Sequence, residues 1–360
     1  MPLKYPLSET ELWWVNHQKW LQSCGYLLRP RFRVGWVQST IEEETMTRTS
    51  WVMDATRIAD GAIVALKRVR RKASSQEERI MRLLNSDALV AHPDNPCAPL
   101  YDVLSVPDEV DFEIFVIPFL RRFDSPPFET VGEIMDFCRQ ALCGLRFLHD
   151  NGIAHRDPHY MNIMLDPTNM YPHGFYPGKP YHDDLTPDFS RHAKAFTRTQ
   201  RPSRYFWIDY GLSGKYDRSD RPGLLLVPYV MGGNKDIPET KQKRKHADPF
   251  AADVWWMGDL IQKKLITSYS GLEFLKPLVV NMCQENPEDR PSMAAAAAQF
   301  DAILAQCSAW RLRGLTVRRK DQLGRFLRAF PAYVVHTLAY LLMQVPALPS
   351  SREHQDDRRT

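Results

Sequence analysis

The segment from Ile153 to Asp166 holds residues whose types and spacing suit phosphoryl transfer. It reads I-A-H-R-D-P-H-Y-M-N-I-M-L-D, so that Asn162 follows Asp157 after four intervening residues. Transfer of a phosphoryl group to a hydroxyl needs an acceptor for the hydroxyl proton and an oxygen ligand for a metal ion nearby. We expect Asp157 to take the first role and Asn162 the second. The apolar run after Asn162 predicts a strand that anchors the loop.

A second segment, from Phe206 to Ser213, reads F-W-I-D-Y-G-L-S and places one carboxylate at the end of an apolar run. Gly211 allows the backbone to turn there. An Mg²⁺ ion that bridges the phosphates of ATP needs such an anionic oxygen ligand. The sequence therefore predicts Asp209 as a metal ligand together with Asn162.

A third signal is the apolar run V-A-L that ends at Lys67, before a helix expected over residues 75–85. One face of that helix carries an acid and three apolar side chains, at Glu77, Ile80, Met81 and Leu84. A carboxylate on a buried face needs a cationic partner, and Lys67 is the natural candidate. Glu78 lies three residues after Ser75 and fits a capping box, so Glu77 is preferred to Glu78 as the partner of Lys67.

The elements that must position these residues follow from turn signals and hydrophobic periodicity. Strands are expected over residues 51–55, 62–67 and 111–120, and Asp60-Gly61 predicts a hairpin turn between the first two. A capping box at Ser8 begins a first helix, and a longer helix is expected over residues 131–149. The first third of the chain is thus strand-rich around one helix and the rest is mainly helical, which predicts an α+β fold.

Together these segments resemble the protein-kinase superfamily over roughly residues 50–307. Tyr210 stands where that superfamily usually has Phe. The stretches D-A-T-R-I-A-D-G and W-L-x-S-C-G-Y-L-L-R-P-R-F, with the long insert and I-D-Y-G-L-S, resemble the expanded kinase-like family of mushroom-forming fungi. The resemblance implies a bilobal protein-kinase-like fold, with a small β-rich N-lobe, a larger helical C-lobe, and N- and C-terminal extensions.

The resemblance also implies how Mg-ATP would bind. Lys67, fixed by Glu77, would hold the α- and β-phosphates, while Asn162 and Asp209 would hold Mg²⁺. The adenine site would be formed by hinge residues and one residue after the catalytic loop: Ile117, Pro118, Leu120 and Leu165.

Arg156, next to Asp157, implies regulation by phosphorylation of the activation segment. The hydroxyl side chains available there are Ser213, Tyr216, Ser219 and Tyr229.

Three further segments resemble the kinase C-lobe. Pro238-Glu239 lies where the activation segment ends, D-V-W-W-M-G from Asp253 resembles the central helix, and N-P-E-D-R-P contains Arg290. Asp248-Pro249 supplies an N-cap and an N1 proline for the central helix. The resemblance implies a buried, structural ion pair between Glu239 and Arg290.

Three departures accompany these matches. No G-x-G-x-x-G precedes Lys67, and residues 45–50 contain no glycine. His159 stands where many Ser/Thr kinases have a lysine. A surplus of about residues 166–204, rich in Pro, His, Tyr and Asp, predicts an irregular inserted loop.

The expected domains are an extension with an amphipathic helix (1–50), an N-lobe with hinge (51–120), a C-lobe (121–307) and a basic, then apolar, tail (308–360). In the tail, residues 310–328 carry seven Lys or Arg against one acid, and residues 329–348 are largely apolar. This order fits a peripheral membrane segment. Because prolines, His336 and Gln344 interrupt the apolar run, we expect a docked C-terminal helix instead of a transmembrane one.

Composition limits the classes of function. Of 360 residues, 47 are basic and 43 acidic, so wholesale nucleic-acid binding is not expected. Six cysteines without a C-x-x-C pair, and the absence of a signal-peptide pattern, predict an intracellular and mainly cytoplasmic protein, with nucleus or membrane surface as alternatives. The basic run at residues 241–246 is interpreted as a solvated loop in preference to an acidic-substrate site or a nuclear-localisation patch.

Three functions remain open. The first is an ATP-dependent phosphotransferase that acts on a protein hydroxyl, of Ser or Thr, by in-line γ-phosphoryl transfer. The second is a pseudokinase scaffold, which the missing glycines favour. The third is a small-molecule kinase of the aminoglycoside- or choline-phosphotransferase type, which D-P-H-Y-M-N-I and I-D-Y-G resemble but which lacks the Pro-Glu, D-V-W and Asp-Arg-Pro segments.

Overall fold

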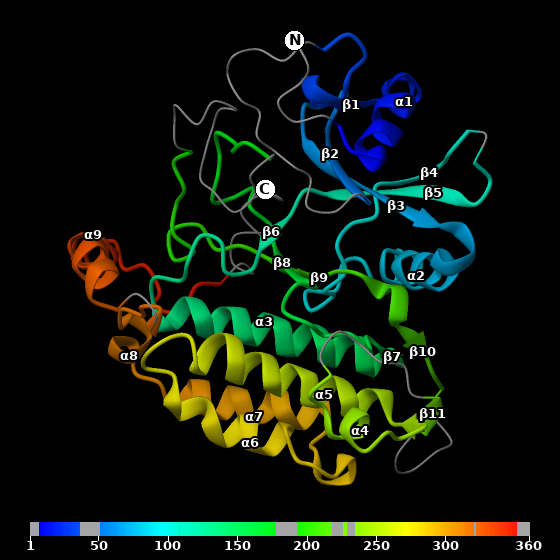
Figure 1. Cartoon of the computed structure of the whole chain (residues 1–360). Helices are drawn as coiled ribbons and strands as arrows, with labels where there is room; N and C mark the ends of the chain where they lie inside the picture. Colours follow the sequence, from blue (N-terminus) through cyan, green and yellow to red (C-terminus); the bar gives the residue numbers. More distant parts are fainter. Residues whose placement is uncertain are drawn as a thin grey trace. The chain divides into compact units, whose positions relative to one another are not determined.

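The computed structural model describes residues 7–36, 51–107, 109–177, 193–217, 226–228, 235–319 and 322–350. The chain forms two compact units of mixed α and β structure (Figure 1). The first unit comprises residues 1–75, 98–122 and 166–195, and the second comprises residues 76–97, 123–165 and 196–360. Residues 45–50, the stretch without glycine before Lys67, lie outside the described residues.

The first unit is built on a five-stranded antiparallel sheet in the order β1-β2-β3-β5-β4. Its strands are β1 (Tyr26–Leu28), β2 (Val52–Arg57), β3 (Ile63–Arg70), β4 (Asp102–Ser105) and β5 (Phe112–Pro118). The strands expected over 51–55, 62–67 and 111–120 are thus confirmed, and Gly61, at a φ of 75°, turns the chain between β2 and β3. A short strand β6 (Arg121–Arg122) and a 3₁₀ turn η1 (Pro30–Phe32) complete this unit.

Helix α1 (Glu9–Ser23) covers the sheet of the first unit. The predicted capping box is confirmed, because the Ser8 hydroxyl accepts from the Glu11 N–H and the Glu11 carboxylate accepts from the Ser8 N–H. The core beneath is apolar and formed by Trp14, Leu21, Tyr26, Leu28, Phe32, Met53, Ala55, Val64, Leu66, Val106, Ile114 and Val116. At its edge, buried Arg29 pairs with Asp54 at 2.7 Å and donates to the Tyr176 hydroxyl.

Helix α2 (Arg71–Leu84) begins four residues before the expected start at Ser75. Ser75 therefore lies inside the helix, and the capping box assigned to Glu78 is wrong. R-K-A-S-S contains no helix breaker, so the helix continues directly from β3. Glu78 instead pairs with Arg82 at 2.7 Å, one helical turn later, whereas Glu77 is buried as predicted.

The second unit is mainly helical. Helix α3 (Val131–Asp150) packs against α7 (Met293–Ala305), and α5 (Pro249–Leu260) packs against α6 (Lys276–Met282) (Figure 1). Thr130 caps α3 and Asp248 caps α5, as the sequence predicted for Asp248. Helix α5 continues into a π turn, η3 (Ile261–Ile266). The remaining helical segments are η2 (Tyr210–Leu212), α4 (Pro238–Lys241), η4 (Glu273–Leu275), η5 (Pro287–Asp289), α8 (Ala309–Arg313) and α9 (Gln322–Leu342).

Three short antiparallel strand pairs complete the second unit. They are β8 (Ile163–Leu165) with β9 (Tyr205–Trp207), β7 (Ile153–Ala154) with β10 (Gly214–Lys215), and β11 (Val227–Pro228) with β12 (His246–Ala247). The strand expected after Asn162 is therefore β8. The first two pairs tie the segments around Asp157 and Asp209 to each other.

The buried ion pair between Glu239 and Arg290 is present within the second unit. Two guanidinium nitrogens donate to the two carboxylate oxygens, at 2.7 and 2.9 Å, and both side chains are 0% exposed. Arg290 also donates to the carbonyls of Ala251, Gln284 and Glu285. All donors of the buried guanidinium are used, which is the condition for tolerating such a pair away from water.

The two ends of the long insert, residues 166–177 and 193–204, form turns without helix or strand, in keeping with an irregular loop. In the first unit, Tyr171 and Phe175 lie against the guanidinium of buried Arg121, with ring centroids at 4.8 and 4.6 Å. In the second unit, buried Arg198 donates to the carbonyls of Phe123, Pro126 and Pro127. The ends of the insert are therefore packed parts of the two units.

The C-terminal segment forms a docked helix, as the sequence predicted. Helix α9 bonds to the second unit through His336 and Tyr340. Within the described ranges, no helix combines the length and the hydropathy needed to cross a bilayer. All six cysteines are free thiols.

Candidate functional site

Asp157 and Asn162 lie together on the loop between β7 and β8. The Asn162 amide nitrogen donates to the Asp157 carboxylate at 3.0 Å and to the Asp157 carbonyl at 3.0 Å. Two bonds to one residue fix the rotamer of Asn162, so its amide oxygen has a defined direction. The pair that the sequence spacing predicted is therefore brought into hydrogen-bond contact.

Asp209 reaches the same loop through its neighbour in the chain. The Ile208 N–H donates to the Asn162 carbonyl at 2.9 Å, one residue beyond the end of β9. Asp209 itself has a φ of 64°, a left-handed conformation that is uncommon for residues other than glycine. Such backbone strain is concentrated at functional sites, where surrounding structure maintains it. Here the strand pair β8–β9 is that structure.

Asp253 on α5 holds the start of the loop, whereas the sequence indicated only that it begins a segment that resembles the central helix. Its carboxylate accepts from the backbone N–H groups of His155 and Arg156, both at 2.7 Å, and lies 3.0 Å from His149 Nε2. The carboxylate is 0% exposed, so these charge-assisted bonds form in a medium of low dielectric. Asp253 is a positioning residue, because it acts through the backbone that carries Asp157.

Glu77 belongs to the second unit and lies beside the turn that follows Asp209. A Cβ placed on Gly211 would be 3.5 Å from an Asp209 carboxylate oxygen and 3.8 Å from a Glu77 carboxylate oxygen. Tyr210 is buried in the same region. Burial raises the pKa of Tyr210 well above its ordinary value, and the neighbouring Cys97 and Glu77 act in the same direction. Tyr210 is therefore a neutral packing residue at physiological pH.

The other predicted nucleotide residues divide between the two units. Lys67 lies in the middle of β3, between Val52 on β2 and Phe115 on β5, and Ile117 and Pro118 lie on β5. Leu120 is buried in the first unit, and Leu165 is buried at the end of β8 in the second. The Lys67–Glu77 pair and the adenine site join residues of different units and stay predictions.

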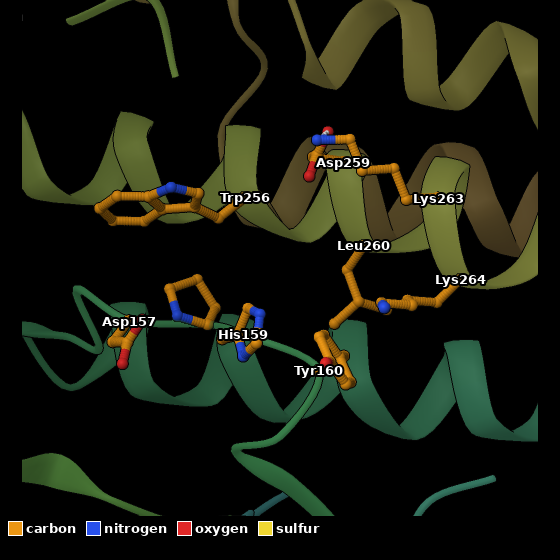
Figure 2. A pocket seen from close by; sticks show the side chains of 9 residues that line it. Asp157, His159, Tyr160, Trp256, Asp259, Leu260, Lys263 and Lys264 are labelled. Atoms are coloured by element: carbon orange, nitrogen blue, oxygen red, sulfur yellow. Dashed lines mark ion pairs between the residues drawn. The ribbon is translucent and has the colours of Figure 1, made fainter. Parts of the chain in front are cut away.

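A hollow of about 220 Å³ opens beside Asp157 within the second unit (Figure 2). Residues 157–160 supply one wall, and α5 with η3 supplies the other. The lining residues are Asp157, Pro158, His159, Tyr160, Trp256, Asp259, Leu260, Lys263 and Lys264. Lys263 is neutralised by Asp236 at 2.5 Å and Asp259 at 2.9 Å. The ammonium of Lys264 lies 3.5 Å from the centroid of the Tyr160 ring. No sequence motif had indicated the wall formed by α5 and η3.

Two histidines near Asp157 are neutral at physiological pH. Burial lowers the pKa of His155 below 6.5, although Asp253, Asp157 and Asp209 oppose this effect. Its tautomer is set by its partners, because Nδ1 accepts from the Asp157 N–H and Nε2 donates to the Ile208 carbonyl. Burial also lowers the pKa of His159, which the positive charge of Lys264 reinforces and Asp157 opposes. His159 therefore does not reproduce the cation of the lysine that many kinases have there.

Arg156 donates to the Tyr216 hydroxyl at 2.9 Å and to the Pro228 carbonyl at 3.3 Å. Of the hydroxyls considered for regulation, Ser213 is buried and donates to the His155 carbonyl, which makes it a structural residue. Ser219 and Tyr229 lie outside the described residues. Tyr216 is the one predicted regulatory side chain that the structure brings to Arg156.

The ligand atoms near Asp157 suit Mg²⁺. An amide oxygen from Asn162 and a carboxylate from Asp209 are hard oxygen ligands, and Mg²⁺ commonly takes one or two carboxylates with the rest of its shell from phosphates and water. Among the residues the structure describes, no cluster of three or more His, Cys, Asp or Glu side chains could hold a metal by itself.

Comparison with known proteins gives a partial relative. A putative ribosomal protein S6 kinase alpha-2 from Caenorhabditis elegans is 32% identical to this chain over 113 residues. The match spans 31% of this chain and 14% of the length of that relative. No family model matches the chain. Part of the chain is therefore similar to a protein named as a kinase.

Proposed function

We propose that the chain is an ATP- and Mg²⁺-dependent phosphotransferase that acts on a protein hydroxyl of Ser or Thr. This proposal rests mainly on the hydrogen bond between the side chains of Asp157 and Asn162. The backbone carbonyl of Asn162 also accepts a hydrogen bond from Ile208, the residue before Asp209. Phosphoryl transfer depends mainly on positioning and charge stabilisation, and this loop is positioned from both ends, by Asp253 and by β8. The partial similarity to a kinase supports the same chemistry.

In the proposed reaction, Asp157 orients the attacking hydroxyl and accepts its proton. The new bond joins the hydroxyl oxygen to the γ-phosphorus, and the bond from that phosphorus to the β-γ bridging oxygen breaks. Asn162 and Asp209 would hold Mg²⁺, which, when bound, offsets charge on the transferred group. The hollow beside Asp157 would receive residues that flank the acceptor hydroxyl.

Transfer of labelled γ-phosphate to a peptide library tests this proposal. Asp157→Asn keeps the shape of the side chain but removes the proton acceptor, and we expect a loss of about 10²–10⁴-fold in rate. Asp209→Ala and Lys67→Ala should abolish transfer. Asp301→Asn on the exposed side of α7 is the matched control and should retain full activity. Equal transfer by Asp157→Asn and the parent would rule out the assigned site.

A pseudokinase scaffold is the second candidate, because no glycine precedes Lys67 where phosphates would approach the backbone. Thermal unfolding with and without Mg-ATP separates the two functions. A ligand at 100 times its Kd stabilises the folded state by about 2.7 kcal/mol. An unchanged Tm at millimolar Mg-ATP, together with no transfer, would favour the scaffold.

A further inference from the structure

Helix α9 is attached to the second unit along one side. The Tyr340 hydroxyl bonds to the Thr197 hydroxyl at 2.8 Å, and His336 Nδ1 lies 2.9 Å from the Glu129 carboxylate. Val345 follows the end of α9, and its carbonyl accepts a hydrogen bond from Arg313 at 2.5 Å. The polar groups of His336 and Tyr340, on this side of α9, therefore have their partners within the second unit.

The opposite side of α9 is apolar and exposed. We define the α9 apolar face as its exposed large hydrophobic residues: Leu327, Phe330, Val334, Val335, Leu338, Leu341 and Leu342. At about 100° per residue, these positions span an arc of about 140°, whereas His336 and Tyr340 fall on the other side of the helix. Leu342 is 86% exposed and Leu338 is 56% exposed. Leucines this exposed, gathered on one face, indicate an interaction surface.

The charge near the α9 apolar face and the width of that face indicate whether it binds a lipid surface or a second copy of the chain. Residues 310–328 contain seven basic residues and one acid, and the part of α9 that follows, residues 329–342, contains no acid. Arg318 and Arg319 pair with Asp124 and Glu273, and the other five basic residues keep the segment positive. A positive segment beside an apolar face complements an anionic lipid surface. A helix-to-helix seam between two copies would need a narrower stripe than this arc.

We propose that α9 lies on the surface of an anionic lipid bilayer and inserts its apolar face between the headgroups. The docked side, with His336 and Tyr340, would remain against the second unit. This inference does not depend on the proposed phosphotransferase activity, because it uses no residue of the candidate site. Its consequence is that the second unit would be held at a membrane.

Flotation of the full chain with vesicles tests the inference. The probes are vesicles of phosphatidylcholine alone and vesicles with about 30% phosphatidylserine, an anionic fraction that creates a surface potential of the kind found at cytoplasmic leaflets. We expect the chain to float with the anionic vesicles and to be released in high salt, since salt screens the attraction. Leu338→Glu/Leu342→Glu should weaken partition by roughly 100-fold or more, because two large apolar side chains leave the lipid.

The matched control is Val110→Glu/Val280→Glu, which replaces two exposed aliphatic residues elsewhere and makes the same change of charge. It should float like the parent, and both double variants should keep the parent Tm. Three results would overturn the inference: no flotation of the parent, equal binding to both kinds of vesicle, or unchanged flotation of Leu338→Glu/Leu342→Glu. A dimer in sedimentation velocity that the same double variant abolishes, without vesicle binding, would assign the face to a second copy.

Discussion

At the scale of single residues, the burial of an ion pair decides how much the loss of one partner destabilises the fold. Arg290 and Glu239 are fully buried, whereas Arg319 and Glu273 form a pair at the surface. Arg290→Ala leaves a buried carboxylate without a partner, so we expect unfolding to become easier by about 3–5 kcal/mol. Arg319→Ala should cost about 1 kcal/mol or less. Urea unfolding of the two variants measures both values, and equal midpoints would contradict this account.

His155 gives a second prediction at this scale, for the dependence of stability on pH. Its pKa in the folded chain is lowered below the ordinary 6.5, so between these two values the unfolded chain binds more protons. The contribution of His155 to stability is therefore fully present above pH 6.5 and is lost as the pH falls through the folded-state pKa. One such group contributes a slope of at most about 1.4 kcal/mol per pH unit.

Unfolding free energies across the acid range, for the parent and His155→Asn, measure this slope. The variant should lose the His155 part of the dependence. His246→Asn, at an exposed position, is the control and should behave like the parent. A parent curve that stays flat through this range would be evidence against the lowered pKa.

At the scale of elements, Gly152 ends α3 and starts the segment that carries Asp157. Gly152 and Gly61 have similar positive φ angles, 70° and 75°, so alanine is strained at both. A Cβ on Gly61 meets nothing within 4 Å, but one on Gly152 would come 2.5 Å from the Tyr216 carbonyl oxygen. Gly61→Ala should cost about 1–2 kcal/mol, and Gly152→Ala clearly more.

The same pair of variants separates stability from activity. Gly152→Ala must displace Tyr216, whose hydroxyl accepts from Arg156 next to Asp157, so phosphoryl transfer should fall as well. Gly61→Ala should leave the rate unchanged under conditions in which it is folded. Similar losses of stability and transfer rate for both variants would mean that the close approach of residue 152 to Tyr216 does not affect either property.

Elements also show how far local sequence can be interpreted. The capping box at Ser8, the turn at Gly61 and the helix over residues 131–149 were predictable because each depends on a few neighbouring residues. The start of α2 was not predictable from S-S-Q-E, because the residues before this motif also favour a helix. The helix can therefore begin before Ser75. A local signal failed where the flanking residues permitted a longer helix.

At the scale of the whole molecule, the predicted Lys67–Glu77 pair would couple the two units. A double-mutant cycle with Lys67→Met and Glu77→Gln should give a coupling energy of about 0.5–3 kcal/mol in chemical unfolding. The control cycle uses Glu78→Gln, because Glu78 is bonded to Arg82, and should give no coupling to Lys67. Additive effects of Lys67→Met and Glu77→Gln would show that the two residues do not interact.

The sequence by itself determined the secondary elements around the candidate site and the spacing of Asp157 and Asn162, and its family resemblance implied the partnership of Glu239 with Arg290. Only the tertiary structure decided that Asp253 holds the backbone of His155, that Trp256 and Lys264 face His159 across a hollow, and that α9 docks by one side. The physical reason is sequence separation. Local propensity acts over a few residues, whereas these arrangements join segments roughly 100–200 residues apart, and packing of the whole unit selects them.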